Sequence, residues 1–486
     1  MARLVIMGAG VSGHTAALHA HKKLKRDHEV VVVSPNSKWN WIPSNIWVGV
    51  GFMNKDQVTF DLAPIYKKIG VPFYQAKATA IYPEGDSDHQ DPFIQITYTG
   101  ENRKGETEKL TYDYLINATG PQLRFDKTEG LGPDNGYTTS VCTHGHAEQA
   151  FQHLEESIDR MKKGERQKFL IGTGHGTCTC QGAAFEYLLN VEHLTHKHGV
   201  RDKADIAWIT NEMELGDFGM GGMHIKRGGY VTHSRIFTES LFTERGIRWI
   251  KRAGVKEIDK KKCQYELLDG TVNEEAFDFS MLLPPFTGVP LQAFDNKGNE
   301  ITDRLFAPNG FMKVDADYSG KPYEEWSPSD WPETYQNSTY ENIFAVGIAF
   351  APPHAISMPA KSTNGNPISP TPPRTGMPSG VMGREVAFNI VDMMKGDAEK
   401  PVRHASMSDM GAACIASAGA GALKGTAVSM TMYPIIPDFE TYPDTGRSPT
   451  YTTGEIGLAG HWIKHLLHFG FMYKAQAKPL WKLIPE

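Results

Sequence analysis

The sequence predicts an α/β protein with two doubly wound parallel sheets and a further C-terminal region. Two observations lead to this fold class. A short apolar run, a glycine-rich turn and a helical pattern follow one another at residues 4–20 and again at 168–187. The length of 486 residues also exceeds what one hydrophobic core usually supports, so several domains are expected.

The overall composition is that of a folded protein with many loops. Hydrophobic residues make up 40% of the chain and charged residues 22%, with 48 glycines and 30 prolines. The formal net charge of −6 and the lack of a basic run argue against nucleic acid as the main partner. Five cysteines in a chain of this length do not make a disulfide framework.

The N-terminus carries no pattern of a secretory signal, because an apolar strand begins near Arg3 without a charged region before it. A transmembrane helix needs about 20 apolar residues, and every approach to that length is broken by Pro or built of Gly, Ala and Ser. We therefore expect a protein that faces the cytoplasm and meets a membrane, if at all, from one side only.

The first glycine-rich turn has the context of a dinucleotide site. It follows the apolar run at residues 4–7 and precedes a helical pattern through residues 16–20, and its glycines are Gly8, Gly10 and Gly13. The first permits a tight turn, the second lets the backbone approach a pyrophosphate, and the third lets the helix pack on the strand. The helix N-terminus faces the phosphates.

A second strand over residues 29–33 arrives where a βαβ unit needs it. The acidic residue that usually binds the ribose hydroxyls at the end of this strand is missing, and Ser34, Pro35 and Asn36 stand there instead. We expect these three residues to line the cofactor. A merely structural glycine turn is the alternative.

Two further segments resemble the strand-and-turn signatures of the two-dinucleotide-domain, glutathione-reductase-like flavoproteins. They are residues 114–121 and 343–348. In that group the first segment closes the FAD domain and the second returns the chain to the flavin. The resemblance implies two Rossmann-like domains and FAD as the ligand. The residues expected to contact FAD in this part of the chain are Ala78, Thr119, Gly120 and Gly347.

The second glycine-rich turn departs from the pattern of an NADH site. Gly172 and Gly174 hold its first two positions, but Thr177 takes the third. Cys178 and Cys180 stand at the helix entry, where a nicotinamide site needs a small residue and a carboxylate. The sequence therefore predicts a domain of this fold that does not bind NADH.

A cysteine at a helix N-terminus gains thiolate character, because the positive end of the helix dipole favours the anion. Cys178 and Cys180 are therefore candidate reactive thiols. The alternative is that one or both are small buried residues, as free cysteines often are. A structural zinc site needs four ligands, and no second closely spaced pair exists, so no metal is expected.

Four segments, in order along the chain, resemble motifs of the sulfide:quinone oxidoreductases. Residues 42–51 are similar to the family's Pro-Ser-Asn-x-Trp-Val-Gly-Val-Gly segment beside the flavin, and residues 141–148 to its Cys-Thr-x-x-His-Ala-Glu motif. Residues 180–187 match its Cys-x-Gly-x-Ala-x-Glu-Tyr motif, and residues 414–419 its later cysteine with a following glycine. The resemblance covers nearly the whole chain.

This resemblance implies roles for the cysteines. In the family a cysteine pair works at the flavin face and a third cysteine helps to carry sulfur, which corresponds here to Cys180 and Cys414 with Cys142. Cys178 is extra and leaves open which thiol of the Cys-x-Cys works, whereas Cys263 is read as a bystander. If FAD is covalently attached, Cys142 is the first residue to suspect.

The implied reaction is the oxidation of hydrogen sulfide to polysulfide or sulfur, with electrons passed to a membrane quinone of the ubiquinone or menaquinone type. Sulfide opens a disulfide or polysulfide bridge by thiol–disulfide exchange, which leaves a persulfide on one cysteine and a thiolate on the other. FAD carries the electrons onward. His146, four residues after Cys142 and thus on the same face of a helix, and Glu186 are candidate acid–base groups, with a structural role as the alternative for both.

Further cofactor contacts follow from the same resemblance. Pro43 and Ser44 belong to the segment beside the flavin, and Arg374, Thr375 and Gly376 are similar to the family's Pro-Lys-Thr-Gly element with Arg in place of Lys. A fixed cation there would stabilise an anionic reduced flavin, and a surface salt bridge is the alternative.

The C-terminal stretch 460–474 mixes aromatic residues with Lys and His. Trp462, Leu466, Phe469 and Tyr473 recur at helical spacing, which suits a helix in the bilayer interface. A soluble core helix is the alternative. The family's C-terminal region supplies membrane anchorage and the quinone pocket, and Lys464 is a candidate flavin neighbour.

The expected domains are residues 1–125 and 305–400 for FAD, 126–304 for the second nucleotide-binding-like unit, and 401–486 for the C-terminal membrane and quinone region. A peripheral protein of the cytoplasmic membrane and a homo-oligomer are expected. The alternatives are a flavocytochrome-type sulfide dehydrogenase subunit, an NAD(P)H-dependent disulfide or quinone reductase, and a catalytically silent sulfur carrier.

Overall fold

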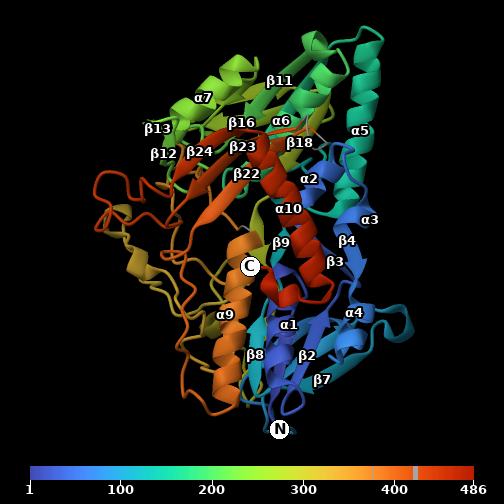
Figure 1. Cartoon of the computed structure of the whole chain (residues 1–486), viewed down its shortest axis with the longest axis vertical. Helices are drawn as coiled ribbons and strands as arrows, with labels where there is room; N and C mark the ends of the chain where they lie inside the picture. Colours follow the sequence, from blue (N-terminus) through green and yellow to red (C-terminus); the bar gives the residue numbers. More distant parts are fainter. Residues whose placement is uncertain (375, 420–424) are drawn as a thin grey trace.

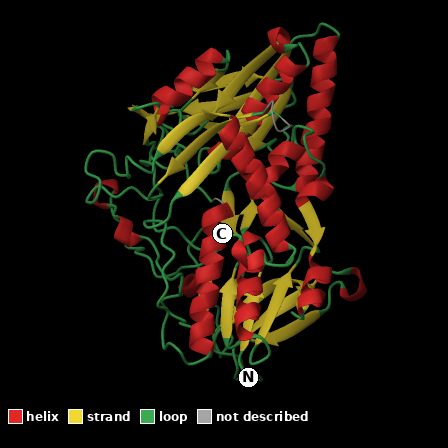
Figure 2. Cartoon of the chain, in the orientation of Figure 1, coloured by secondary structure: helices red, strands yellow, loops and turns green. Residues whose placement is uncertain are grey.

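The computed structural model describes residues 1–374, 376–419 and 425–486, with a β-sheet near each end of the long axis (Figure 1). The sheet of the N-terminal strands lies at the end that holds the N-terminus, and the sheet around β10 lies at the other. Figure 2 shows helices packed along the sheets at both ends. The fold therefore follows the predicted arrangement of two α/β units and a C-terminal region.

The N-terminal sheet has the strand order β21-β8-β1-β2-β5-β6-β7, and β20 pairs with β5. Strand β1 pairs in parallel with β2 and with β8, and β21 pairs in parallel with β8. The predicted strands at residues 4–7, 29–33, 114–117 and 343–345 are thus neighbours in one sheet. The bounds are β1 Arg3–Met7, β2 Glu29–Ser34, β5 Phe73–Tyr82, β6 Phe93–Tyr98, β7 Thr107–Thr111, β8 Tyr114–Asn117, β20 Gln292–Ala293 and β21 Ile343–Ala345.

Two helices, α1 (Val11–Leu24) and α9 (Gly376–Met394), pack against each other on this sheet (Figure 1). Glycines permit their close approach. A Cβ on Gly13 would lie 2.1 Å from the carbonyl oxygen of Gly8, and a Cβ on Gly383 would lie 2.2 Å from that of Ser12. The third glycine of the first motif therefore does what the sequence predicts, since it lets α1 pack on β1.

The second sheet has the order β14-β11-β10-β18, with every pair parallel. Helices α5, α6 and α7 and a small antiparallel sheet, β15-β16-β17, complete this unit. The bounds are β10 Gln167–Thr173, β11 Ala204–Ile209, β14 Arg248–Ile250, β18 Phe279–Leu283, β15 Ala253–Ile258, β16 Lys262–Leu267, β17 Val272–Ala276, α5 His144–Lys162, α6 Gln181–Lys197 and α7 Ser234–Glu244.

A five-stranded sheet of the order β13-β12-β24-β23-β22 stands between these units. Helix α10 packs on β22 and β23, and α6 of the second unit packs against β22. Among the described residues, no helix is both long and apolar enough to cross a bilayer. The bounds are β12 His224–Arg227, β13 Tyr230–His233, β22 Ala412–Ala418, β23 Thr426–Met432, β24 Thr453–Gly457 and α10 Leu458–Ala475.

Three segments of the expected second unit pair outside it, and one of them is β19, which pairs with β9. Strands β12 and β13 join the C-terminal sheet, and β20 joins the N-terminal sheet. The shorter elements are β3 Lys38–Asn40, β4 Thr59–Asp61, β9 Pro121–Leu123, β19 Phe286–Gly288, α2 Asn45–Val48, α3 Lys55–Val58, α4 Leu62–Ile69 and α8 Thr302–Leu305.

Replacement of Gly13 by alanine is expected to lower the free energy of unfolding by about 3 kcal/mol, because the new methyl group collides with the Gly8 carbonyl. Gly10→Ala is the matched control. A Cβ at Gly10 meets no atom within 4 Å, so this change should cost no more than about 1 kcal/mol. Denaturant unfolding of the cofactor-free chain measures both, and equal losses would contradict the packing role of Gly13.

Candidate active site

The first glycine turn leaves an open cradle at the carboxyl edge of the N-terminal sheet. Gly10 is the N-cap of α1, makes no side-chain capping bond, and has free space where a Cβ would stand. The N–H groups of the first helical turn are therefore free to bind an anion, which the helix dipole favours. The cradle fits the pyrophosphate of a dinucleotide.

The expected cofactor residues of the neighbouring strands end at the same edge. Gly8 approaches Ala118, directly before Thr119, and Gly347 approaches the Ser12 side chain. Gly120 has a positive φ and open space at its Cβ position. Ser34 pairs with Gln75 at the end of β2, so Ala78, three residues farther along β5, lies beyond that end. The residues placed at the edge by these contacts are Gly8, Gly10, Gly13, Ser34, Pro35, Asn36, Ala78, Thr119, Gly120 and Gly347.

The remaining expected cofactor residues are more scattered. A Cβ on Gly376 would stand 3.7 Å from the Pro43 ring, so these two lie together. The Ser44 hydroxyl instead shares a hydrogen bond of 2.9 Å with Nδ1 of His468 on α10. Lys464 pairs with Glu186, away from the glycine turn. Thr375 lies outside the described residues.

Arg374 is a mostly enclosed cation. Its guanidinium donates to the carbonyl oxygens of Ile348 and Phe350, and it lies over the rings of Phe311 and Phe350 at 4.9 and 5.0 Å. Burial lowers its pKa to about 10, and no carboxylate among the described residues pairs with it. The alternative of a surface salt bridge therefore does not apply. A buried positive charge of this kind favours an anion nearby.

A segment of the chain itself covers the second glycine turn. The carbonyl oxygen of Gly176 accepts the backbone N–H of Ser369 at 2.9 Å and the side-chain amide of Asn211 at 3.0 Å. A Cβ on Gly176 would stand 2.2 Å from the carbonyl oxygen of Pro367. Residues 367–372 thus lie across the place where a second dinucleotide would meet this turn.

The five thiols fall into two classes. Cys178 and Cys263 are buried, whereas Cys142, Cys180 and Cys414 are partly exposed. The Cys178 thiol donates a hydrogen bond of 3.0 Å to the carbonyl oxygen of Leu283, which turns it into the second sheet. The sequence leaves both thiols of the Cys-x-Cys open, and the structure exposes only Cys180.

Helix α6 begins at Gln181, with Cys180 as its N-cap in the left-handed conformation at φ 65°. Cys178 therefore lies outside the helix, and the expected dipole effect does not reach it. Burial raises the pKa of the Cys180 thiol above its usual value, opposed by the backbone N–H and the positive charge of Arg374. Burial therefore acts against the thiolate character that the sequence leads us to expect at the start of this helix.

Cys414 lies against the first turn of the helix that Cys180 caps. Its Sγ stands 2.9 Å from the position of a Cβ on Gly182. Burial raises the pKa of Cys414 to about 12. The negative charge of Glu186 acts in the same direction, and the positive charge of Lys464 opposes it. Burial also raises the pKa of Cys142 to about 12, with a contribution from Cys180. The three partly exposed thiols form one electrostatically linked group.

The two acid–base candidates lie in different surroundings. His146 Nε2 stands 3.6 Å from Asp134 Oδ2, its ring meets Phe125 edge-on, and burial lowers its pKa. Cys142 precedes Thr143, the N-cap of α5, so the helical spacing expected between Cys142 and His146 does not hold. The structure therefore gives His146 an ion-pair partner and no helical relation to the thiol.

Glu186 is buried within the thiol group's neighbourhood. It forms an ion pair with Lys464 of α10 and accepts the backbone N–H of Ser417 at 3.1 Å. Burial raises its pKa, which its partners partly offset. Lys464 also lies 5.3 Å from the Trp47 ring. The ion pair links α6 to α10, and the bond from Ser417 links both to β22.

The histidines on the inner face of α10 were not among the site residues predicted from the sequence. His461, His465 and His468 line it at helical spacing, and the Nε2 atoms of the first two are 3.1 Å apart. The ring of Trp47 lies 4.6 Å from that of His465 and 6.1 Å from that of His468. The spacing of these histidines was a readable signal, because positions i, i+4 and i+7 share one helix face.

The outer face of α10 carries the predicted aromatic and aliphatic residues. Leu466 is 72% exposed and Phe469 61%, with Trp462 and Tyr473 also exposed. The helix thus exposes large apolar side chains to solvent and buries histidines and lysines beside apolar residues, which is unlike a soluble surface helix.

Comparison with known proteins gives a consistent family. A curated relative, the sulfide-quinone reductase of Aquifex aeolicus, is 30% identical over 416 residues, which cover 86% of this chain and 81% of the relative. The crystal structure of the sulfide:quinone oxidoreductase from Aquifex aeolicus matches 98% of this chain and 92% of its own at 27% identity, with a TM-score of 0.75. The structure of NDH2 from Plasmodium falciparum shares the fold at 12% identity and a TM-score of 0.62, over 100% and 99% of the two chains. No family model matches.

Iodoacetamide is expected to modify Cys142, Cys180 and Cys414 in the reduced native chain and to spare Cys178 and Cys263, because only the first three are exposed. Burial raises their pKa values, so near neutral pH the thiolate fraction and the rate should rise about tenfold per pH unit. Peptide mass spectrometry after quenching at several pH values measures this. Modification of Cys178 as fast as Cys180 would contradict the assignment.

Proposed function

The chain belongs to the sulfide:quinone oxidoreductase family, and on this premise we propose which of its residues carry the reaction. It is an FAD-dependent oxidoreductase that oxidises sulfide with a quinone as electron acceptor. The observation that carries the proposal is the group of three partly exposed thiols around the N-terminus of α6.

Cys180 and Cys414 are the working pair. When they are joined by a sulfur–sulfur bond, hydrosulfide attacks the sulfur of Cys414, a new bond forms there, and the electron pair of the broken bond leaves on Cys180 as a thiolate. Arg374 supports this direction, because its N–H and its charge both stabilise the Cys180 anion. Lys464 supports it as well, since its charge acts on Cys414, where the anionic sulfide arrives.

Glu186 takes the proton that sulfide loses. Burial raises its pKa, which makes the carboxylate a better proton acceptor than an exposed one, and its pairing with Lys464 keeps it at the Cys414 side. Cys142 is electrostatically linked to Cys180 and is the proposed carrier of the growing sulfur chain. Cys178 is a structural thiol, tied to the Leu283 carbonyl.

FAD fits the cradle at Gly10 and, when bound, supplies the two-electron acceptor between the cysteine pair and the quinone. The residues proposed to hold it are those at the edge of the N-terminal sheet, together with Pro43 and Gly376. Arg374 is the proposed counter-charge for an anionic flavin or thiolate. Residues 367–372, which cover the second glycine turn, support sulfide over NADH as the electron donor.

Helix α10 is the proposed quinone and membrane element. Its outer apolar face rests in the bilayer interface, which brings a lipid-soluble quinone to the molecule. Its inner face carries His461, His465 and Lys464, which are placed to supply the protons that a quinone takes up as it becomes a quinol. Peripheral attachment to the cytoplasmic membrane and a homo-oligomeric state complete the proposal.

Sulfide is expected to bleach the flavin absorbance within one turnover, and NADH is not. The bleaching is retained in Cys178→Ser and lost in Cys180→Ser, because only Cys180 faces the pair partner. Stopped-flow absorbance measures the reduction, and reoxidation by a short-chain quinone completes the cycle. Catalytic reduction by NADH without reduction by sulfide would overturn the proposal. Loss of bleaching in Cys178→Ser alone would overturn the choice of thiol.

Leu466→Glu combined with Phe469→Glu is expected to weaken binding to phosphatidylcholine vesicles about 100-fold, because two apolar contacts with the acyl chains are lost. Vesicle sedimentation measures it. The melting temperature should not fall, since both side chains face solvent. Val272→Glu, an equally exposed apolar position on β17, is the control and should bind like the unaltered chain. Equal binding of the α10 variant would contradict the attachment.

A further inference from the structure

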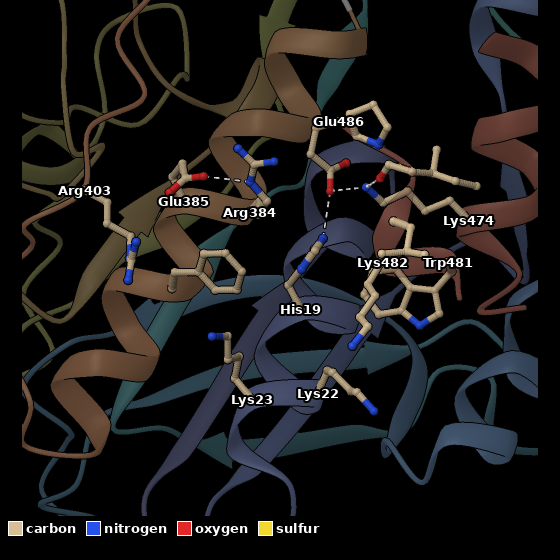
Figure 3. Close-up of a pocket in the computed structure, with 14 residues that line it drawn as sticks. His19, Lys22, Lys23, Arg384, Glu385, Arg403, Lys474, Trp481, Lys482 and Glu486 are labelled. Atoms are coloured by element: carbon tan, nitrogen blue, oxygen red, sulfur yellow. Dashed lines mark hydrogen bonds and ion pairs between the residues drawn. The ribbon is translucent and has the colours of Figure 1, made fainter. Parts of the chain in front are cut away.

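A cationic pocket lies beside the end of the apolar helix face, away from the thiols. It has a volume of about 390 Å³ and is enclosed by α1, α9 and the C-terminal turn η8 (Trp481–Leu483) (Figure 3). Six lysine or arginine side chains and two glutamates line it. The proposed reaction uses none of these groups.

The negative charge of Glu486, which lines the pocket, is already paired within the protein. Glu486 has a buried side chain that accepts from His19 Nε2 at 2.8 Å and pairs with Lys474 of α10 (Figure 3). Lys474 also donates to the carbonyl oxygen of Ile484 at 2.7 Å. This buried triad fixes η8 against α1 and α10. The charge of the Glu486 carboxylate is therefore offset by Lys474, although only Oε1 accepts hydrogen bonds and Oε2 has no hydrogen-bond partner among the described residues.

The pocket lining has more cations than carboxylates. Among the described residues, no carboxylate pairs with Lys22, Lys23 or Lys482, although all three line the pocket. Lys23 lies over the Phe388 ring at 5.2 Å. Like charges gathered in a concavity repel one another and focus a positive potential, so a multivalent anion bound among them relieves the repulsion. A phosphate group has that charge and several acceptor oxygens for ammonium donors.

The mouth of the pocket opens beside apolar residues. Leu480 and Leu483 are each 69% exposed, and Leu483 belongs to the pocket lining. The Tyr473 hydroxyl, on the outer face of α10, donates to the carbonyl oxygen of Pro479 at 2.9 Å. The chain from α10 to η8 thus continues the apolar face to the pocket. A bilayer that covers α10 brings its headgroups to Lys22 and Lys482.

We propose that this pocket binds the phosphate of an anionic lipid headgroup, with the acyl chains running along Leu480, Leu483 and the outer face of α10. The inference rests on the proposed membrane attachment of α10. The apolar face supplies attachment to any bilayer, and the pocket supplies the preference for an anionic one. Excess cations next to exposed apolar residues are what such a lipid requires.

The test compares vesicles of phosphatidylcholine alone with vesicles that also contain phosphatidylglycerol. The unaltered chain should bind the second kind more tightly. Lys22→Gln with Lys482→Gln should weaken binding to phosphatidylglycerol vesicles by about tenfold or more and leave binding to phosphatidylcholine unchanged. Lys478→Gln is the matched control, because this lysine is exposed in the same segment but lies outside the pocket, over the Tyr473 ring. It should fall less than twofold.

Each outcome separates the two proposals. If the unaltered chain binds neither kind of vesicle, the attachment of α10 fails. If it binds both kinds equally, the attachment stands and the pocket proposal is overturned. Equal losses in the Lys478 control and the pocket variant also overturn it, since they indicate diffuse surface charge. Stabilisation of the unaltered chain by inorganic phosphate in a thermal shift assay, abolished in the pocket variant without an effect on vesicle binding, identifies a soluble phosphate and overturns the lipid assignment.

Discussion

The contact between α6 and β22 is the constraint on which the site depends. It joins parts of the chain more than two hundred residues apart and places Cys414 against the helix turn that Cys180 caps. Buried polar groups hold it. Asn190 of α6 donates to the carbonyl oxygen of Ser417 and accepts the N–H of Gly419, while Glu186 accepts the N–H of Ser417. Because unpaired buried groups are costly, this network fixes the position of β22.

Burial has the largest effect on the pKa values of the thiols, and nearby cations partly offset it. Desolvation raises the pKa of Cys180 and Cys414, which would leave both as neutral thiols at neutral pH. Each has one cation that acts against this, Arg374 for Cys180 and Lys464 for Cys414. Glu186 accompanies Lys464 and limits its effect. The Cys180 side is therefore the better place for a thiolate, because its cation has no carboxylate partner among the described residues.

Local patterns in the sequence predicted those features of the fold that depend on residues close together in the chain. The glycine turn at Gly8–Gly13, its two flanking strands and the exposed apolar face of α10 follow from spacing, whereas the strands at 114–117 and 343–345 were expected from a family resemblance. Contacts distant in sequence escaped prediction. Residues 367–372 cover the second glycine turn through backbone bonds that no side-chain pattern encodes. The left-handed Cys180 moves the start of α6 past Cys178, and desolvation, which depends on the whole fold, reverses the expected thiol pKa.

The two faces of α10 lie in different surroundings, and this explains its unusual composition. Its inner side must supply Lys464, because a buried Glu186 without a cation would carry the full penalty of desolvation. Its outer side carries exposed apolar residues, and water is a poor solvent for Leu466 and Phe469 there. In the last turn of the helix, which ends at Ala475, Lys474 pairs with Glu486 and anchors η8 beside the cationic pocket. One helix therefore carries, on opposite faces, the cation that acts on Cys414 and the exposed side chains of Leu466 and Phe469.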